Sequence, residues 1–294
     1  MKETVLALQD AVREIAHLMR VGSIAEDFGE KHGKQNESGD HQETVDVAAD
    51  LAVSKRLMNC SEVHAFASEE REAITVTEGG KYLVAYDPLD GSQNIAVNIT
   101  TGLIFGIFSC SSKLPADGRS IIGAGYALFG AATQFVLATE ESGVTIFTLD
   151  PTSKEFKVTS ARHRIPQRGK VYACNEGLHS KWVEQRSKRW AETMRGRSVR
   201  WMACMVSDAH RILLNGGGFL LPADRSNTKG KLRLLYEAYP MAYVFECAGG
   251  HATDEHNTCI LDLPFPPASP AKVLHMKVPV FLAGPYEAEL YAKL

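Results

Sequence analysis

The stretch that most constrains the fold of this chain is a short apolar run that ends in turn-forming and acidic residues, YLVAYDPLDGSQN at 82–94. Val84–Tyr86 has the length and the β-favouring composition of a buried strand. Pro88 and Gly91 interrupt that pattern, and the polar residues directly after Gly91 often begin helices. We therefore predict a strand, a turn and a helix in this order.

The predicted turn also indicates a chemistry. It brings Asp87 and Asp90 close together, and the free N–H groups at the start of the following helix point into the same volume. Carboxylates attract cations, whereas free amide groups attract anions. The stretch therefore predicts a metal ion that carries a phosphate, with the aspartates on the metal and the amides on the phosphate.

The composition excludes several classes of protein. The 294 residues fit one large or two medium domains, and 45% hydrophobic with 23% charged residues is typical of a soluble globular protein. A net charge of −3 gives no general attraction to nucleic acid or to a membrane surface, so an anionic substrate needs local cations.

The apolar stretch from Ile121 contains glycines and predicts paired strands with a turn near Gly130 rather than a membrane span. Six scattered cysteines favour a reducing compartment such as the cytoplasm, although a removed organelle-targeting segment leaves no trace.

The pattern along the chain predicts two α/β subdomains. Apolar spacing of three and four predicts helices over 3–20 and 44–58, with a polar surface loop over 26–42 between them. The basic, proline-containing stretch RHRIPQRGK is the best boundary. We therefore expect an N-terminal subdomain with the metal-binding motif at 1–165 and a C-terminal subdomain that binds the substrate at 166–294.

Further acidic residues lie upstream of the turn: Asp40, Asp46, Glu69 and Glu70. Each pair taken alone is explained as a solvated surface. Together with the two aspartates of the turn they offer many hard oxygen ligands, which suit Mg²⁺ or Mn²⁺ better than zinc.

A second group of charged residues alternates with leucines in KGKLRLLYE. On a strand, Lys231 and Arg233 share one face and aim two cations at one pocket, with Glu237 further along. A solvated strand face is the alternative. We favour the pocket, because carboxylates and phosphates gathered in one place repel each other strongly without such cations.

The ordered motifs resemble the fructose-1,6-bisphosphatase family, which includes the sedoheptulose-1,7-bisphosphatases. The resemblance covers nearly the whole chain and is carried by GD, SEE, GKYLVAYDPLDGSQN, TGLIFGIF, GAGYALFG, NEG, MVSDAHR, GKLRLLYE and PMAYVFECAGG. It implies a layered αβαβα sugar-phosphatase fold with two α/β subdomains, Mg²⁺ dependence and a homotetramer.

The resemblance also implies roles for individual residues. Mg²⁺ would be bound by Glu69, Glu70, Asp87, Asp90, Glu237 and the Leu89 carbonyl. Asp40 would lock a mobile loop over the metals, and Asp46 with Glu70 would activate the attacking water. The remaining residues would bind substrate: the Gly91 and Ser92 amides and Arg233 the 1-phosphate, the Met205 backbone and Asp90 the sugar hydroxyls, and Asn175, Lys231 and Arg200 the distal phosphate, with Arg200 reaching in from a neighbouring subunit.

Three positions depart from the family pattern. Leu178, Trp201 and Leu221 stand where the fructose enzymes carry tyrosines, so we expect a roomier pocket and a preference for sedoheptulose 1,7-bisphosphate. Two alternatives stay open at this point: a fructose-1,6-bisphosphatase and a non-catalytic family member. A phosphatase for inositol or nucleotide phosphates is a weaker one, because the KLRLLYE and NEG segments are typical of sugar phosphatases.

Overall fold

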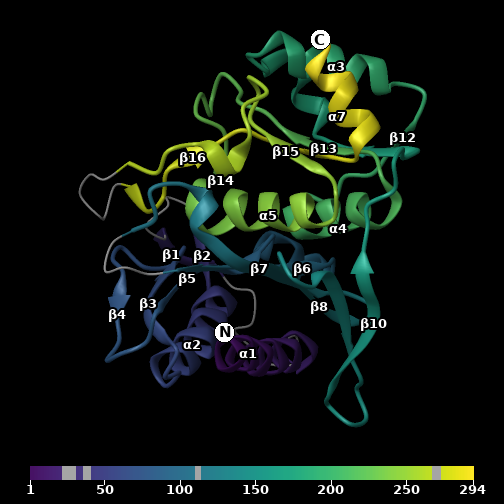
Figure 1. Cartoon of the computed structure of the whole chain (residues 1–294). Helices are drawn as coiled ribbons and strands as arrows, with labels where there is room; N and C mark the ends of the chain where they lie inside the picture. Colours follow the sequence, from purple (N-terminus) through teal and green to yellow (C-terminus); the bar gives the residue numbers. More distant parts are fainter. Residues whose placement is uncertain (22–30, 36–40, 110–113, 267–272) are drawn as a thin grey trace.

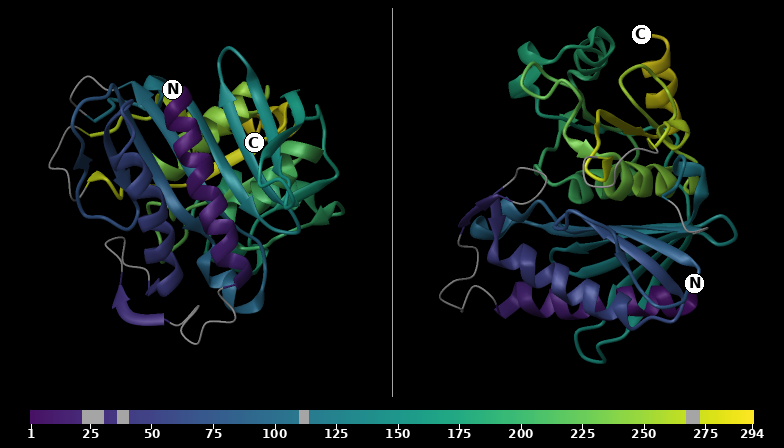
Figure 2. Two further views of the ribbon diagram at one scale, coloured as in Figure 1. Left: turned by 90° about the horizontal axis from the view of Figure 1, so that it is seen from below. Right: turned by 90° about the vertical axis from the view of Figure 1, so that its left-hand side faces the viewer.

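The elements of the protein stack in five layers, helix, sheet, helix, sheet and helix (Figures 1 and 2). This is the α/β fold with αβαβα layers that the sequence predicts, and the prediction is confirmed. The structure is a computed structural model that describes residues 1–21, 31–35, 41–109, 114–266 and 273–294, with only the backbone of 31–35 and 41–44.

Helices form the two outer layers and the middle one. The pairs are α1 (Lys2–Val21) with α2 (Thr44–Met58) below the first sheet, α4 (Met205–Asn215) with α5 (Tyr239–Cys247) between the sheets, and α3 (Gln185–Met194) with α7 (Pro285–Ala292) above the second sheet. Val12 and Ile15 of α1 are fully buried, as the amphipathic pattern predicts. None of the described helices combines the length and the apolar composition that crossing a bilayer requires.

The first sheet has eight strands, and all neighbouring pairs are antiparallel except β3 and β5. Its order is β10 (Phe156–His163), β9 (Gly143–Leu149), β8 (Thr133–Thr139), β7 (Ile121–Phe129), β6 (Thr101–Ser109), β5 (Tyr82–Asp90), β3 (Val63–Ser68) and β4 (Thr75–Val76). The predicted strand pair around Gly130 is the hairpin of β7 and β8. Helices cover both faces of this sheet, which explains why its central strands are almost entirely apolar.

The second sheet has five strands in the order β12 (Ser198–Val199), β11 (Val171–Ala173), β13 (Gly218–Leu221), β17 (Val280–Ala283) and β15 (His251–Thr253). Two small ladders complete the sheet structure of the described residues: β1 (Lys31–Gln35) with β2 (His41–Glu43), and β14 (Leu232–Arg233) with β16 (Lys277–Val278). The short helical turns are η2 (Ser92–Val97), η3 (Gly118–Ser120), η4 (Glu176–Lys181), η5 (Leu234–Ala238) and η6 (Ile260–Asp262).

The largest apolar cluster joins the two sheets through the middle helices. α5 packs on β7 and β8 on one side and on β15 on the other, and α4 packs on β6 and β11. The cluster contains Phe108 from the first sheet, Leu213 and Phe245 from the helices, and Leu282 from the second sheet. The core therefore runs across the expected boundary at 165/166, which stays a prediction.

The polar stretch 26–42 differs from its prediction where it is described. Residues 31–35 and 41–43 pair as strands, so the expectation of a loop is wrong there. Pairing in a two-stranded ladder joins backbone groups and needs no apolar pattern. The remaining residues of this stretch, Asp40 among them, lie outside the described residues.

A buried polar pair in the middle of the molecule gives a stability prediction. The Tyr126 hydroxyl on β7 lies 2.8 Å from Nδ1 of His210 on α4, and burial lowers the pKa of His210 to about 4, so the imidazole is neutral at pH 7. Tyr126→Phe leaves that nitrogen unpaired, and we expect a loss of about 1–3 kcal/mol in the free energy of unfolding. Urea denaturation measures it; an unchanged midpoint and slope would contradict the expectation.

Candidate active site

The predicted site residues gather around one cleft of about 610 Å³ between the two halves of the chain. Thirteen of them line it: Asp46, Glu69, Glu70, Asp87, Leu89, Asp90, Gly91, Ser92, Asn175, Met205, Lys231, Arg233 and Glu237. The segments that carry them are far apart in sequence, so the cleft is a product of the fold. The structure therefore brings together most of the site that the sequence predicts.

Two predicted residues are not among those that line the cleft. Asp40 lies outside the described residues. Arg200 is exposed and its Nη1 donates to the backbone carbonyl of Val199 at 2.7 Å. Its predicted role across a subunit interface stays a prediction.

The local structure around the two aspartates differs from the predicted one. β5 does not end before Pro88 but continues to Asp90, and the helix after it is the 3₁₀ turn η2. Asp87 is paired with Ile104 of β6, and Asp90 is paired with Gly102. The chain therefore advances by three residues on β5 where it advances by only two residues on β6. This is a β-bulge. The extra residue allows two side chains three positions apart to share one face, whereas a regular strand would place them on opposite faces.

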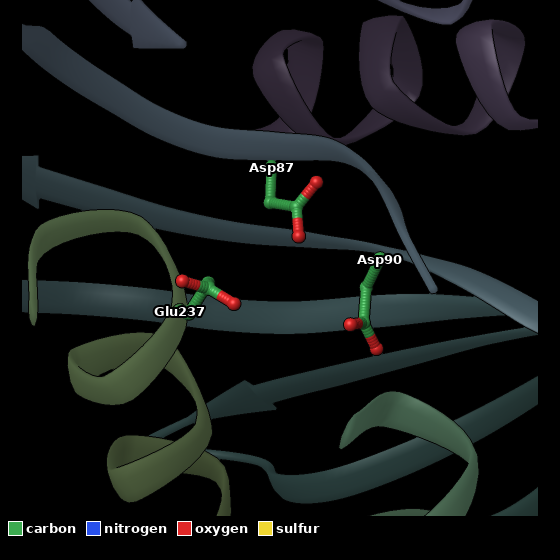
Figure 3. Close-up of side chains that lie close together, drawn as sticks. All are labelled: Asp87, Asp90 and Glu237. Atoms are coloured by element: carbon green, nitrogen blue, oxygen red, sulfur yellow. The ribbon is translucent and has the colours of Figure 1, made fainter. Parts of the chain in front are cut away.

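Glu237 completes an acidic cluster from the other half of the chain. It lies on η5, a single turn of π-helix between β14 and α5. Carboxylate oxygens of Asp87, Asp90 and Glu237 all lie within 4.8 Å of one another (Figure 3). Oxygen ligands at such spacing fit a hard divalent cation.

The pKa shifts of this cluster indicate that a bound cation would stabilise it. Burial, and then the charges of Glu69, Glu237 and Asp90, hold the pKa of Asp87 well above its usual range. Burial also raises the pKa of Glu237, against the opposing effect of Arg233. The pKa of Asp90 rises to about 6 for the same reason, although two hydrogen bonds oppose the rise. Asp87 and Glu237 therefore keep their protons to a higher pH than free carboxyl groups do, unless a cation replaces those protons.

Asp90 also connects the cluster to the start of α4. Its Oδ2 accepts from the Val206 amide at 2.7 Å and from Sγ of Cys204 at 3.2 Å. The next residue, Gly91, has φ of 76°, and a Cβ there would lie 2.7 Å from Cβ of Cys204. Glycine is thus required both by conformation and by the close approach of the α4 N-terminus.

Cationic side chains also line the cleft. Arg233 is buried, and its Nη1 lies 3.0 Å from Oε1 of Glu69 and 3.9 Å from Oε2 of Glu237. Lys231 is more exposed, and its Nζ lies 4.0 Å from Oδ2 of Asp224. Only two residues of the expected strand are extended, yet Lys231 and Arg233 both line the cleft. Both side chains thus line one cleft, and the binding roles predicted for them stay predictions.

Sequence reasoning missed three residues of this region. Lys277 lines the cleft and is paired with Arg233 across the β14–β16 ladder, but a single lysine gave no pattern. Asp224 also lines it; its Oδ1 accepts from the Ser226 and Asn227 amides, so DRSN signals a turn rather than a site. Cys204 could not be found from its sequence neighbours.

Comparisons with known proteins agree with this geometry. The family model described as "Fructose-1-6-bisphosphatase, N-terminal domain" matches residues 1–161, and the model of its C-terminal domain matches residues 165–288. A class 1 fructose-1,6-bisphosphatase of Sulfurihydrogenibium is 38% identical, over 98% of this chain and 90% of that relative. The cytosolic fructose-1,6-bisphosphatase of rice (Oryza sativa subsp. indica) is 37% identical, over 86% of this chain and 77% of that relative.

A solved structure gives the same result. The holo form of Leishmania major fructose-1,6-bisphosphatase superimposes with a TM-score of 0.92 at 34% identity, and covers 99% of this chain and 93% of its own. The fold and these matches make the protein a phosphatase, an enzyme that hydrolyses phosphate esters. The chain belongs to the fructose-1,6-bisphosphatase family.

The raised pKa of Asp87 gives a prediction that separates stability from activity. Because its folded-state pKa lies above the unfolded value, its contribution to stability is greatest at acid pH and is lost as the pH rises through the folded-state pKa. At pH 8 without metal, Asp87→Asn should therefore raise the melting temperature by about 3 °C or more, and the difference should shrink toward pH 4. Phosphatase activity should be lost in the same variant.

Differential scanning fluorimetry at several pH values measures this effect. Asp10→Asn on the surface of α1 is the matched control, since exposed substitutions change stability by about 0.5 kcal/mol or less. A lower melting temperature for Asp87→Asn than for the wild type at pH 8 would show that the carboxylate is not under electrostatic strain.

Proposed function

We propose that this phosphatase removes the 1-phosphate of a sugar bisphosphate with the help of a divalent metal ion. Fructose 1,6-bisphosphate is the proposed substrate. The acidic cluster of Asp87, Asp90 and Glu237 beside Arg233 and Lys231 in one cleft carries the proposal. The names of the relatives reported above support the fructose ester over the sedoheptulose ester.

We assign the metal to the acidic cluster and prefer Mg²⁺, with Mn²⁺ as a substitute. The residues present fit it, because buried carboxylates with raised pKa values and nearby carboxylates need a cation. The proposed ligands are Asp87, Asp90, Glu237, Glu69, Glu70 and the Leu89 carbonyl. When bound, the ion supplies positive charge to the phosphate and acidity to the attacking water.

The protein's own residues would then position and deprotonate the reactants. We propose that the Asp46 and Glu70 carboxylates, both at the cleft, take the proton of the attacking water. The Gly91 and Ser92 amides and the Arg233 guanidinium would hold the 1-phosphate in line with that water. Catalysis would come chiefly from positioning and charge stabilisation, so no covalent intermediate on the protein is required.

The distal end of the substrate would be bound by a separate set of residues of the cleft. We assign the Met205 backbone to the sugar hydroxyls, with Asp90, and assign Asn175 and Lys231 to the distal phosphate. Arg200 would join them from a neighbouring subunit of a homotetramer, and Asp40 would lock its loop over the metals. The five described cysteines are free thiols, which supports the cytoplasm as the proposed compartment.

Sedoheptulose 1,7-bisphosphate is the second candidate, on one specific observation. Leu178, Trp201 and Leu221, the three positions that lack tyrosines, all line the cleft. Trp201 stacks on Phe219, with ring planes 15° apart. A leucine side chain has no hydroxyl to donate to a phosphate, and its smaller volume leaves room for a longer sugar.

The first experiment compares phosphate release from the two esters at matched concentrations of Mg²⁺. A higher kcat/KM for fructose 1,6-bisphosphate supports the proposal, and a higher value for the sedoheptulose ester supports the second candidate. Asp90→Asn should reduce kcat by at least about 10²-fold, because it removes a metal ligand. Wild-type protein that releases no phosphate from either ester would favour the non-catalytic alternative.

Lys231 gives a prediction for the distal phosphate. Lys231→Met keeps the length of the side chain and removes its charge, so we expect KM for either bisphosphate to rise about 10-fold or more. The kcat should fall much less, since the role assigned to this amine concerns the distal phosphate and not the reacting one. Steady-state kinetics with Lys229→Met as the control would test it; equal effects of the two variants on KM would contradict the assignment.

A further inference from the structure

One buried carboxylate outside the proposed ligand set accepts three hydrogen bonds and forms an ion pair. Asp50 lies on α2, four residues after Asp46. Its Oδ1 accepts from Oγ of Ser68 at 2.7 Å and from the hydroxyl of Tyr86 at 2.8 Å. Its Oδ2 accepts from Nε of Arg71 at 2.9 Å and lies 2.8 Å from Nη2 of the same guanidinium. Such complete hydrogen bonding allows a carboxylate to be buried.

The partners of Asp50 are direct sequence neighbours of the proposed metal ligands. Ser68 precedes Glu69, Arg71 follows Glu70, and Tyr86 precedes Asp87. Ser68 also links Asp50 to Glu70, because its Oγ accepts from the Glu70 amide at 3.2 Å. A single side chain thus joins α2, which carries Asp46, to the Glu69–Glu70 turn and β5, the two segments that carry most of the proposed ligands.

We propose that Asp50 is a positioning residue that sets the relative places of the metal ligands. This inference rests on the proposed function, because it concerns the same site. Ligating carboxylates need outer hydrogen bonds to hold the orientation that a metal requires, and the loss of such a bond typically weakens metal binding by about 10–100-fold. Here the bonds hold the sequence neighbours of Glu69, Glu70 and Asp87 instead of the ligands themselves.

The test measures metal binding directly, by titration of the full-length protein with Mn²⁺ monitored by electron paramagnetic resonance. Asp50→Asn keeps the shape and one acceptor oxygen but sets an NH₂ group against the Arg71 guanidinium. We expect its Kd for Mn²⁺ to rise about 10-fold. With Mg²⁺, the concentration needed for half-maximal activity should rise similarly, while kcat at saturating Mg²⁺ and KM for the sugar ester stay close to the wild type.

Two further variants keep the inference falsifiable if Asp50→Asn does not fold. Tyr86→Phe and Ser68→Ala each remove one hydrogen bond to Asp50, and each should raise the Kd for Mn²⁺ by a smaller factor. The control is Ser187→Ala, which removes a buried contact of 3.2 Å with the Tyr291 hydroxyl in the upper half of the molecule. It should leave the Kd for Mn²⁺ unchanged.

The outcomes separate this inference from the proposed function. Lower melting temperatures in the Asp50, Tyr86 and Ser68 variants with an unchanged Kd for Mn²⁺ would overturn the positioning role and leave a structural one. Wild-type protein that binds no Mn²⁺ would overturn the proposed function, and the inference with it. A rise in Kd in these variants and not in Ser187→Ala would establish the positioning role.

Discussion

Mutual repulsion among closely spaced carboxylates is the constraint on which the rest of this structure depends. Asp87, Asp90 and Glu237 lie within 4.8 Å of one another in a region largely removed from water, where like charges interact strongly. Arg233 and the Val206 amide at the start of α4 offset part of this cost. The remaining excess of negative charge supports the proposal that the cluster binds a small, highly charged cation. Stability and function thus oppose each other at this point of the molecule.

The fold meets this constraint because the proposed ligands lie on elements that are held in place by packing in other parts of the molecule. β5 is a central strand of the larger sheet, and η5 continues into α5, which is packed between the two sheets. α2 packs on β3 and β5 from below and is joined to the ligand segments through Asp50. The proposed ligands are therefore carried by packed elements, which suits the precise placement that the proposed metal and phosphate would need.

The sequence predicted the residue types of the site better than the backbone that holds them. Asp87, Asp90, Lys231 and Arg233 could be found because charged residues beside apolar strands are unusual and because ordered motifs resembled a known family. The continuation of β5 through Pro88 could not be found, since proline and glycine normally mark the end of a strand. The contacts of Asp50, Cys204 and Lys277 were equally hidden, because they join segments far apart in the chain.

The bulge in β5 also limits how this chain can change in evolution. Insertions and deletions are usually tolerated in turns, and DPLDGS has the composition of a turn. Here, however, the bulge allows Asp87 and Asp90, three positions apart, to share one face of the sheet. The gain or loss of one residue between them would therefore turn one carboxylate toward the opposite side of the sheet. The segment can accept substitutions between the aspartates far more readily than a change in its length.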